Sequence, residues 1–242
     1  MTLFRSTLFF LWFACVSAIM HVAALPTLLL PRRAIVWAAR RWGAVNLWGL
    51  KAIAGLDYEV RGTIPTDGVL IAAKHMSMWD TMALYTLLDD AAVVIKRELL
   101  SVPFYGWFVR KAGSIVVDRS AHAGALRKMS EDARSVAAGG RSIVIFPEGT
   151  RKNPGALPDY KPGVAGLYKQ LALPCVPVAL NSGLFWTGFI KNSGCIVIEF
   201  LPAIPAGLTR AEFMRTLEQR TEEATARLVA EGRDLLQKHG QS

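Results

Sequence analysis

Short apolar runs, most of them rich in branched residues, recur from residue 57 onward and alternate with segments of helical periodicity. The runs occupy residues 69–73, 91–95, 115–117, 143–146, 175–180 and 195–200. Runs of this length, bounded by turn residues, are typical of buried strands. Between two of them, Leu126, Met129 and Val136 fall at helical spacing, and Gly139-Gly140 ends that segment. The alternation predicts an α/β domain with a central mixed, mostly parallel sheet covered by helices.

An apolar stretch precedes this domain. It runs from Thr7 to Leu30 and is broken by His21 and Pro26. At about 1.5 Å per residue it is long enough to cross a hydrocarbon core of about 30 Å. More arginines follow the stretch than precede it, which favours an inner (cytoplasmic) membrane location with the following domain facing the cytoplasm. A cleaved signal peptide is the alternative, because Val22-Ala23-Ala24 offers small residues near a suitable cut, although the stretch exceeds a usual signal core.

Residues 34–56 differ from that stretch because tryptophans and cations are interleaved. The residues concerned are Trp37, Arg40, Arg41, Trp42, Trp48 and Lys51. Such a mixture suits the headgroup layer of a membrane, where rings are half buried and long basic side chains reach water. An amphipathic helix packed on the core is the alternative. The predicted organisation is therefore a membrane-anchoring helical part over residues 1–56 and an α/β domain over residues 57–242.

The charge balance bears on the partners of the chain. Lys and Arg number 28 against 19 Asp and Glu, a formal net charge of +9. A basic chain suits anionic lipid, nucleic acid or an acidic protein. The sequence contains no nucleic-acid-binding module, no zinc-ligand spacing and no glycine-rich nucleotide motif, so nucleic acid is not an expected partner. The three cysteines, Cys15, Cys175 and Cys195, are scattered in apolar contexts and are typical of buried thiols in a reducing compartment.

His75 and Asp80 lie where the run at 69–73 gives way to a helical segment. On one continuous helix, five residues would separate the two side chains by roughly 140°. If His75 lies in the turn and Asp80 in the first helical turn, the two can meet. Asp80 would then fix the tautomer of the ring and leave the other nitrogen as a general base. The alternative is a surface histidine and a first-turn aspartate without a joint role; Ser77 between them is typical of a helix cap rather than a nucleophile.

A second polar stretch follows the run at 143–146 and reads Phe146-Pro147-Glu148-Gly149-Thr150-Arg151. The His-x4-Asp pair, this stretch, Gly113–Arg119 between them and Val176–Leu180 after them appear in one order over residues 69–181. With these four motifs the chain resembles the glycerophospholipid acyltransferase family, and within it the bacterial lysophosphatidic acid acyltransferases.

The resemblance implies a membrane-bound enzyme that moves a fatty acyl group from an acyl thioester to the 2-hydroxyl of 1-acyl-sn-glycerol 3-phosphate, forming phosphatidic acid. The donor would be acyl-CoA or acyl-acyl-carrier protein, and no bound cofactor or metal is expected. His75 would be the base and Asp80 its orienting partner, with no serine or cysteine nucleophile.

The resemblance also implies an acceptor site. Arg151 and Arg119 would hold the acceptor phosphate, since a guanidinium matches it with a planar fork of donors. Lys96 would hold phosphate or polarise the thioester carbonyl, and Lys161 is a further phosphate candidate; the alternatives are surface ion pairs and solvated lysines. Glu148 would bind an acceptor hydroxyl or hold the arginines, and the Gly149-Thr150 backbone would approach the anion.

Three further points remain open in the sequence. Lys74 stands where the family often has Asn, which adds a cation near the site and keeps another lyso-lipid acceptor, such as a lyso-ornithine lipid, as an alternative. A non-catalytic membrane lipid-binding protein is less favoured, and a lipid hydrolase is disfavoured because no nucleophile-elbow motif is present. Residues 151–167, rich in Pro and Gly, are expected to form a loop near substrate. Residues 99–109 would line an acyl groove or belong to the core, with the core slightly favoured.

Overall fold

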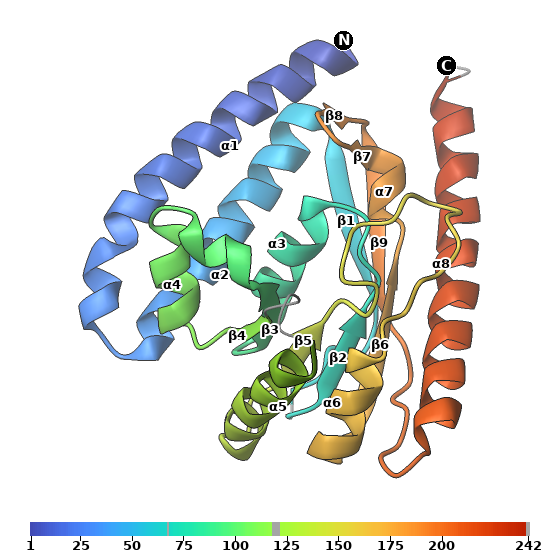
Figure 1. Ribbon diagram of the computed structural model, residues 1–242. Helices are drawn as coiled ribbons and strands as arrows, with labels where there is room; N and C mark the ends of the chain where they lie inside the picture. Colours follow the sequence, from blue (N-terminus) through green and yellow to red (C-terminus); the bar gives the residue numbers. More distant parts are fainter. Residues whose placement is uncertain (67, 118–121, 241–242) are drawn as a thin grey trace.

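The computed structural model describes residues 1–66, 68–117 and 122–240, and Figure 1 shows its central sheet between two groups of helices. The strands are β1 Leu56–Gly62, β2 Leu70–Ala73, β3 Ala92–Lys96, β4 Ile115–Val117, β5 Ile143–Ile145, β6 Cys175–Leu180, β7 Trp186–Thr187, β8 Ile190–Lys191 and β9 Gly194–Phe200. Seven of them form one sheet in the order β1-β9-β6-β2-β5-β3-β4, and β7 and β8 form a separate hairpin. Within the sheet only β6 and β9 pair antiparallel, so the predicted mixed, mostly parallel sheet is confirmed.

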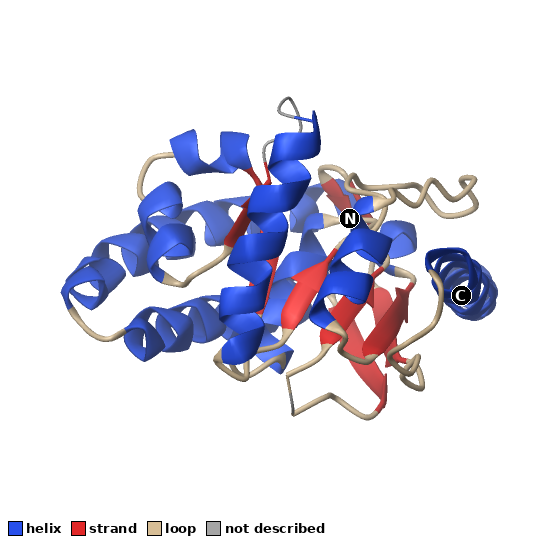
Figure 2. Cartoon of the chain, turned by 60° about the horizontal axis from the view of Figure 1, so that its bottom comes forward, coloured by secondary structure: helices blue, strands red, loops and turns tan. Residues whose placement is uncertain are grey.

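The helices occupy both faces of the sheet. They are α1 Thr2–Ala24, η1 Leu25–Leu29, α2 Arg32–Gly49, η2 Leu50–Ala54, α3 Met78–Leu87, η3 Arg97–Ser101, α4 Tyr105–Lys111, α5 His122–Ala138, α6 Gly163–Leu171, α7 Ser182–Phe185 and α8 Arg210–Gly240. Figures 1 and 2 place α8 across the sheet from α1 and α2.

Alternating residues of the strands feed two separate apolar cores. In β2, Ile71 and Ala73 pack with Trp79 of α3, whereas Leu70 and Ala72 pack with the residues of α6 and α8. All four β2 residues are buried. A strand covered on both faces reads as a continuous apolar run, which is why the sequence revealed this strand but not its alternation.

The N-terminal helices form a layer outside α3. α2 packs between α1 and α3, and the only buried residues of α1 are Ser6 and Phe9. Trp12 and Phe13 also pack against the core, but much of the helix presents apolar side chains outward, among them Leu8, Leu11 and Ile19. Among the described residues, one helical stretch, Thr2–Leu29, is long and apolar enough to cross a membrane by length and composition.

Three elements differ from the sequence-based expectation. The expected loop at 151–167 ends earlier, because α6 begins at Gly163; Pro162 precedes its first turn, where a missing N–H costs no helical hydrogen bond. β1 and the β7–β8 hairpin were not expected. β1 has no continuous apolar run, although its charged and apolar residues alternate as in a strand with one covered face, and each hairpin strand has only two residues. A capping box opens α8: Glu212 accepts from the Thr209 N–H at 2.9 Å, and the Thr209 hydroxyl accepts from the Glu212 N–H at 3.3 Å.

Candidate active site

His75 and Asp80 meet at the carboxyl end of β2. The strand ends at Ala73 and α3 begins at Met78, so His75 lies in the turn and Asp80 in the first helical turn. His75 Nδ1 lies 2.9 Å from Asp80 Oδ2; the His75 side chain is 12% exposed and that of Asp80 is fully buried. Because a carboxylate only accepts, Nδ1 carries the hydrogen, and Nε2 of the neutral ring is an acceptor.

Asp80 is held by several donors besides His75. Its Oδ2 accepts from the backbone N–H groups of Met76 at 2.7 Å and Ser77 at 2.9 Å. Its Oδ1 accepts from the Ser182 hydroxyl, and the Ser77 hydroxyl lies 3.2 Å away. Ser77 is also the N-cap of α3 and accepts from the Trp79 N–H, which confirms its expected capping role. The carboxylate is therefore fixed in position by its surroundings and favoured by the helix dipole.

The His75 ring also touches the second polar stretch of the sequence. It stacks on Phe146 with ring centroids 4.0 Å apart and an interplanar angle of 22°. The His75 carbonyl accepts from the Lys152 N–H at 2.8 Å. The parallel pairing of β2 with β5 brings these segments together, because parallel neighbours end at the same edge of a sheet.

Glu148 lies in a buried ion-pair cluster. Lys74 Nζ is 3.0 Å from Glu148 Oε1 and 2.7 Å from Glu222 Oε1. The Tyr160 hydroxyl donates to the same Glu222 oxygen at 2.9 Å. Of the described arginines, none pairs with Glu148, so the expectation that Glu148 holds arginines is not met within this part of the chain. Glu222 escaped the sequence analysis because it lies in a helix with many other charged residues, far along the chain.

Burial raises the pKa of two groups in this cluster, and the neighbouring cation opposes that rise at Glu148. Burial raises the pKa of Glu148, and the Lys74 ammonium partly offsets that rise. Burial, with the Glu222 carboxylate second, raises the pKa of Tyr160 well above its usual range, so this phenol stays a hydrogen-bond donor.

The basic residues expected to hold phosphate differ in whether a carboxylate already pairs with them. Arg151, after β5, and Lys96, at the end of β3, are exposed and make no ion pair with any other described residue. Lys161 Nζ instead pairs with Asp159 at 2.7 Å. Arg119 lies outside the described residues. Since β2, β5 and β3 are parallel neighbours, His75, Arg151 and Lys96 follow strand ends at one edge of the sheet.

The loop that carries Glu148 needs its glycine. Gly149 has φ +63°, a left-handed conformation that residues with a Cβ rarely adopt. Thr150 next to it is exposed. The loop therefore presents backbone and short side chains at the same edge of the sheet.

The segment 99–109 divides between core and surface. Phe108 and Val109 are buried, whereas Leu99, Phe104 and Trp107 are exposed. The preference for core is thus wrong for half of this segment. Phe104 has φ +62°, a strained conformation for an aromatic residue, and it turns the chain into α4.

A hollow of about 740 Å³ lies away from His75 and Asp80. It is between α2 and the loops at the amino ends of the strands, and none of its lining residues belongs to the turn of His75. Within the described ranges, no group of three or more His, Cys, Asp and Glu side chains could hold a metal ion.

The chain is similar in sequence to known acyltransferases. The acyltransferase family model matches residues 57–181. The 1-acyl-sn-glycerol-3-phosphate acyltransferase of Pseudomonas aeruginosa is 33% identical over 199 residues, covering 81% of this chain and 77% of that protein. The protein of the same name from Saccharomyces cerevisiae is 30% identical over 163 residues, covering 64% of this chain and 54% of its own length. The chain thus matches only about half of the yeast protein.

A solved structure shares the fold. The crystal structure of the 1-acyl-sn-glycerophosphate acyltransferase from Thermotoga maritima superposes with a TM-score of 0.78, covering 94% of this chain and 98% of that one. At 18% sequence identity this likeness concerns the fold alone. The family model and the Pseudomonas relative go further, and they show that this chain belongs to the acyltransferase family.

Proposed function

We propose that this enzyme transfers a fatty acyl group from an acyl thioester to the 2-hydroxyl of 1-acyl-sn-glycerol 3-phosphate, forming phosphatidic acid. The relatives from Pseudomonas and yeast carry the name of this activity. The observation that carries the proposal is the 2.9 Å contact between His75 Nδ1 and the fully buried Asp80, because it prepares Nε2 to accept a proton.

In the proposed mechanism His75 acts twice. Nε2 takes the proton of the acceptor hydroxyl as the hydroxyl oxygen attacks the thioester carbonyl, and Asp80 stabilises the resulting imidazolium. The tetrahedral intermediate then collapses, the C–S bond breaks, and His75 returns the proton to the leaving thiolate. The products are the ester and a free thiol, and His75 is neutral again. No covalent acyl-enzyme is needed.

The acceptor phosphate is proposed to bind where the strands β5 and β3 end. Arg151 and Lys96 are exposed there and free of carboxylate partners within the described chain, so their donors are available to an anion. Arg119 is proposed to share this task. Lys161 is the weaker candidate because Asp159 already accepts from its ammonium. The Gly149 N–H already donates to the Phe146 carbonyl at 2.9 Å, so Gly149 would contribute the turn that brings the backbone of Thr150 close to the anion, and Glu148 would be a nearby carboxylate.

Membrane association is proposed for residues 1–56, with the rest of the chain in the cytoplasm at the inner membrane. The outward apolar face of α1 supports this, as do Trp37 and Trp48 of α2, whose exposed fractions are 60% and 61%. Exposed tryptophan near arginine suits a lipid headgroup layer. Crossing the bilayer and lying within one leaflet are both compatible with this face.

The test is a thioester-release assay on the membrane-bound protein with 1-acylglycerol 3-phosphate as acceptor. Acyl-CoA and acyl-acyl-carrier protein are supplied in parallel, and His75→Ala is the comparison variant. Phosphatidic acid formed by the wild type, with a loss of about 10²- to 10⁴-fold in the variant, is the expected result. Full activity of a folded His75→Ala protein would refute the mechanism. No product with either donor would refute the acceptor assignment, and a lyso-ornithine lipid would be tried next.

A further inference from the structure

Lys74 is a buried cation that the mechanism above does not use. Its side chain is 2% exposed and lies between Glu148, which is 1% exposed, and Glu222, which is 26% exposed. A buried ammonium is unfavourable unless it is paired and hydrogen-bonded, and a buried carboxylate has the same requirement. The two carboxylates thus share the one cation that favours their charged forms.

Glu148 depends on Lys74 most strongly. Lys74 is the only side chain among the described residues that bonds to its carboxylate, through Oε1. The other oxygen, Oε2, is buried and has no hydrogen-bond partner within the described chain. Glu222 differs, because it is partly exposed and also accepts from Tyr160. Removing Lys74 would therefore leave Glu148, rather than Glu222, as an isolated buried charge.

The cluster joins three segments around the dyad. Lys74 directly precedes His75, Glu148 follows Phe146 by two residues, and Glu222 belongs to α8. The Lys74 N–H also donates to the Val178 carbonyl of β6 at 2.9 Å. The adjacent side chains of Lys74 and His75 thus have separate partners: Lys74 pairs with the two glutamates, and His75 contacts Asp80 and Phe146.

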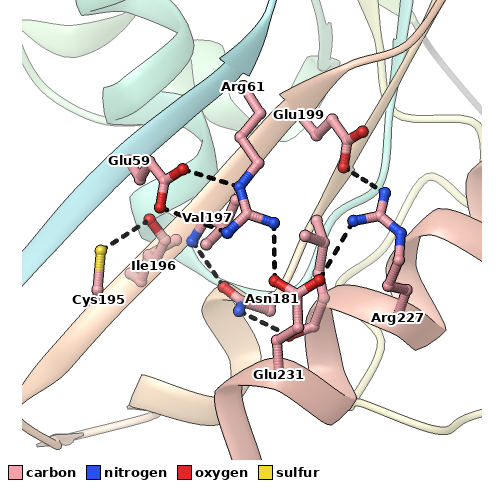
Figure 3. A network of polar contacts seen from close by, with 10 residues as sticks. Glu59, Arg61, Asn181, Cys195, Ile196, Val197, Glu199, Arg227 and Glu231 are labelled. Atoms are coloured by element: carbon pink, nitrogen blue, oxygen red, sulfur yellow. Dashed lines mark hydrogen bonds and ion pairs between the residues drawn. The ribbon is translucent and has the colours of Figure 1, made fainter. Parts of the chain in front are cut away.

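α8 has other attachments to the sheet. Phe213, Leu217 and Leu228 of the helix are fully buried. Figure 3 shows a surface network in which Arg61 of β1 contacts Glu231 of α8 at 2.7 Å. Because these contacts already dock the helix, the pairing of Lys74 with Glu222 is not required to hold it in place.

We propose that Lys74, paired with Glu222 of α8, is a positioning residue that holds Glu148 as an ionised carboxylate beside the histidine turn, and that acceptor binding depends on this carboxylate. Glu222 of the C-terminal helix competes with Glu148 for the same ammonium, so α8 influences the charge state of this carboxylate. This inference rests on the proposed function for its kinetic consequence, but not for the charge state of Glu148.

A salt bridge that merely stabilises the fold would behave differently. The charged and titratable groups facing Glu148 are Lys74 from the turn after β2, Glu222 from α8, and Lys152 from its own loop, with Tyr160 bonded to Glu222. The Lys74 ammonium lowers the pKa of Glu148, whereas the Glu222 carboxylate raises it. Neutralising Lys74 should therefore raise the titration midpoint of Glu148, and neutralising Glu222 should lower it. A substitution that only weakens the fold would not shift the midpoint in these two opposite directions.

The experiment is an infrared pH titration of the full-length protein in detergent, following the protonated carboxyl band that Glu148→Gln removes. With Lys74→Met the midpoint is expected to rise by about one pH unit or more, the usual effect of losing a close opposite charge. With Glu222→Gln, which keeps the size of the side chain, it is expected to fall. If Lys74→Met does not fold, the fall in Glu222→Gln alone decides. An unchanged or raised midpoint in Glu222→Gln overturns the inference.

Kinetics separate this inference from the proposed function. Lys74→Met is expected to lose about tenfold or more in kcat/KM for 1-acylglycerol 3-phosphate at neutral pH, through KM, with a loss that grows as the pH falls. A loss that is constant across pH overturns the role of Lys74, whereas an inactive wild type would count only against the proposed reaction.

The control variant is Arg61→Met with Glu231→Gln. It removes an ion pair of the same helix that does not touch Lys74 or Glu148. The midpoint of Glu148 and the pH dependence of KM are expected to match those of the wild type. A shift equal to that in the Lys74 variants would mean that general loosening of α8 is the cause, which overturns the inference.

Discussion

Asp80→Asn separates the charge of the dyad from its geometry. The buried carboxylate accepts on Oδ2 from His75 and from the backbone N–H groups of Met76 and Ser77, and on Oδ1 from the Ser182 hydroxyl. An asparagine can keep only one oxygen. If its NH₂ replaced Oδ2, it would face two backbone N–H donors, which is repulsive. We therefore expect its oxygen to take the Oδ2 position and its NH₂ to face the serine hydroxyls, which can accept.

In this orientation the tautomer of His75 is preserved and only the charge is lost. The hydrogen bond to the imidazolium formed during proton transfer then changes from charged to neutral. Hydrogen bonds to charged groups contribute about 1.5–3 kcal/mol, so kcat should fall by about 10- to 150-fold. The free energy of unfolding should fall by about 1 kcal/mol, because the first turn of α3 loses a favourable charge at the helix N-terminus.

The assay measures kcat for phosphatidic acid formation, together with thermal unfolding in detergent. Ser182→Ala is the matched control, since it removes a donor to Oδ1 and leaves the contact between Oδ2 and His75 intact. A loss of less than threefold in Asp80→Asn would refute the role of the charge. A loss as large as that of His75→Ala would refute the orientation argument, because it would mean that the NH₂ faces Nδ1 and imposes the wrong tautomer.

Three further predictions concern other parts of the chain. Arg151→Ala should raise the KM for 1-acylglycerol 3-phosphate about tenfold or more, with a small effect on kcat; an equal rise in Arg134→Ala, on the surface of α5, would show a general charge effect. Leu11→Arg with Ile19→Arg, on the outward face of α1, should reduce sedimentation with lipid vesicles; undiminished sedimentation would contradict anchoring by this face. Burial lowers the pKa of Lys191 from 10.5 to about 8. Between these pH values the unfolded chain binds the proton and the folded chain does not, so the protein gains stability as the pH rises. The thermal unfolding midpoint of the wild type, measured relative to that of Lys191→Met, should therefore be higher at pH 10 than at pH 7.5; a constant difference would contradict this.

Local patterns were sufficient to predict most of the sheet. β6 begins and ends where the apolar run predicted, and β4 likewise, because short buried strands carry their signal in their own residues. β1 lacks an apolar run, but Asp57, Glu59 and Arg61 alternate with apolar residues, which is the pattern of a strand with one covered face, so its own residues also predict it. Its pairing with β9 at the sheet edge depends on the rest of the fold.

The site was predictable to the extent that its residues are close in sequence or joined by parallel strands. The contact between His75 and Asp80 follows from a turn of a few residues. The stacking of His75 on Phe146 follows once β2 and β5 are neighbours. The partners Ser182 and Glu222 follow from neither, because each is brought in by an element whose packing depends on the whole fold. No pattern in α8 distinguishes Glu222 from the other glutamates of that helix.

The burial of Lys74 bears on which headgroup the acceptor carries. In the sequence, a cation next to His75 was the reason to consider an acceptor other than a phosphate-bearing lyso-lipid. In the structure this ammonium is 2% exposed and bonded to two carboxylates, so it has no free charge to offer a substrate. An acceptor headgroup would meet the exposed cations instead, Arg151 and Lys96, which have no carboxylate partner among the described residues. A pair of uncompensated cations favours an anion over a zwitterionic headgroup. Because Lys74 is buried and paired, it no longer favours an acceptor such as a lyso-ornithine lipid. The phosphate of 1-acylglycerol 3-phosphate is the better match to the exposed cations.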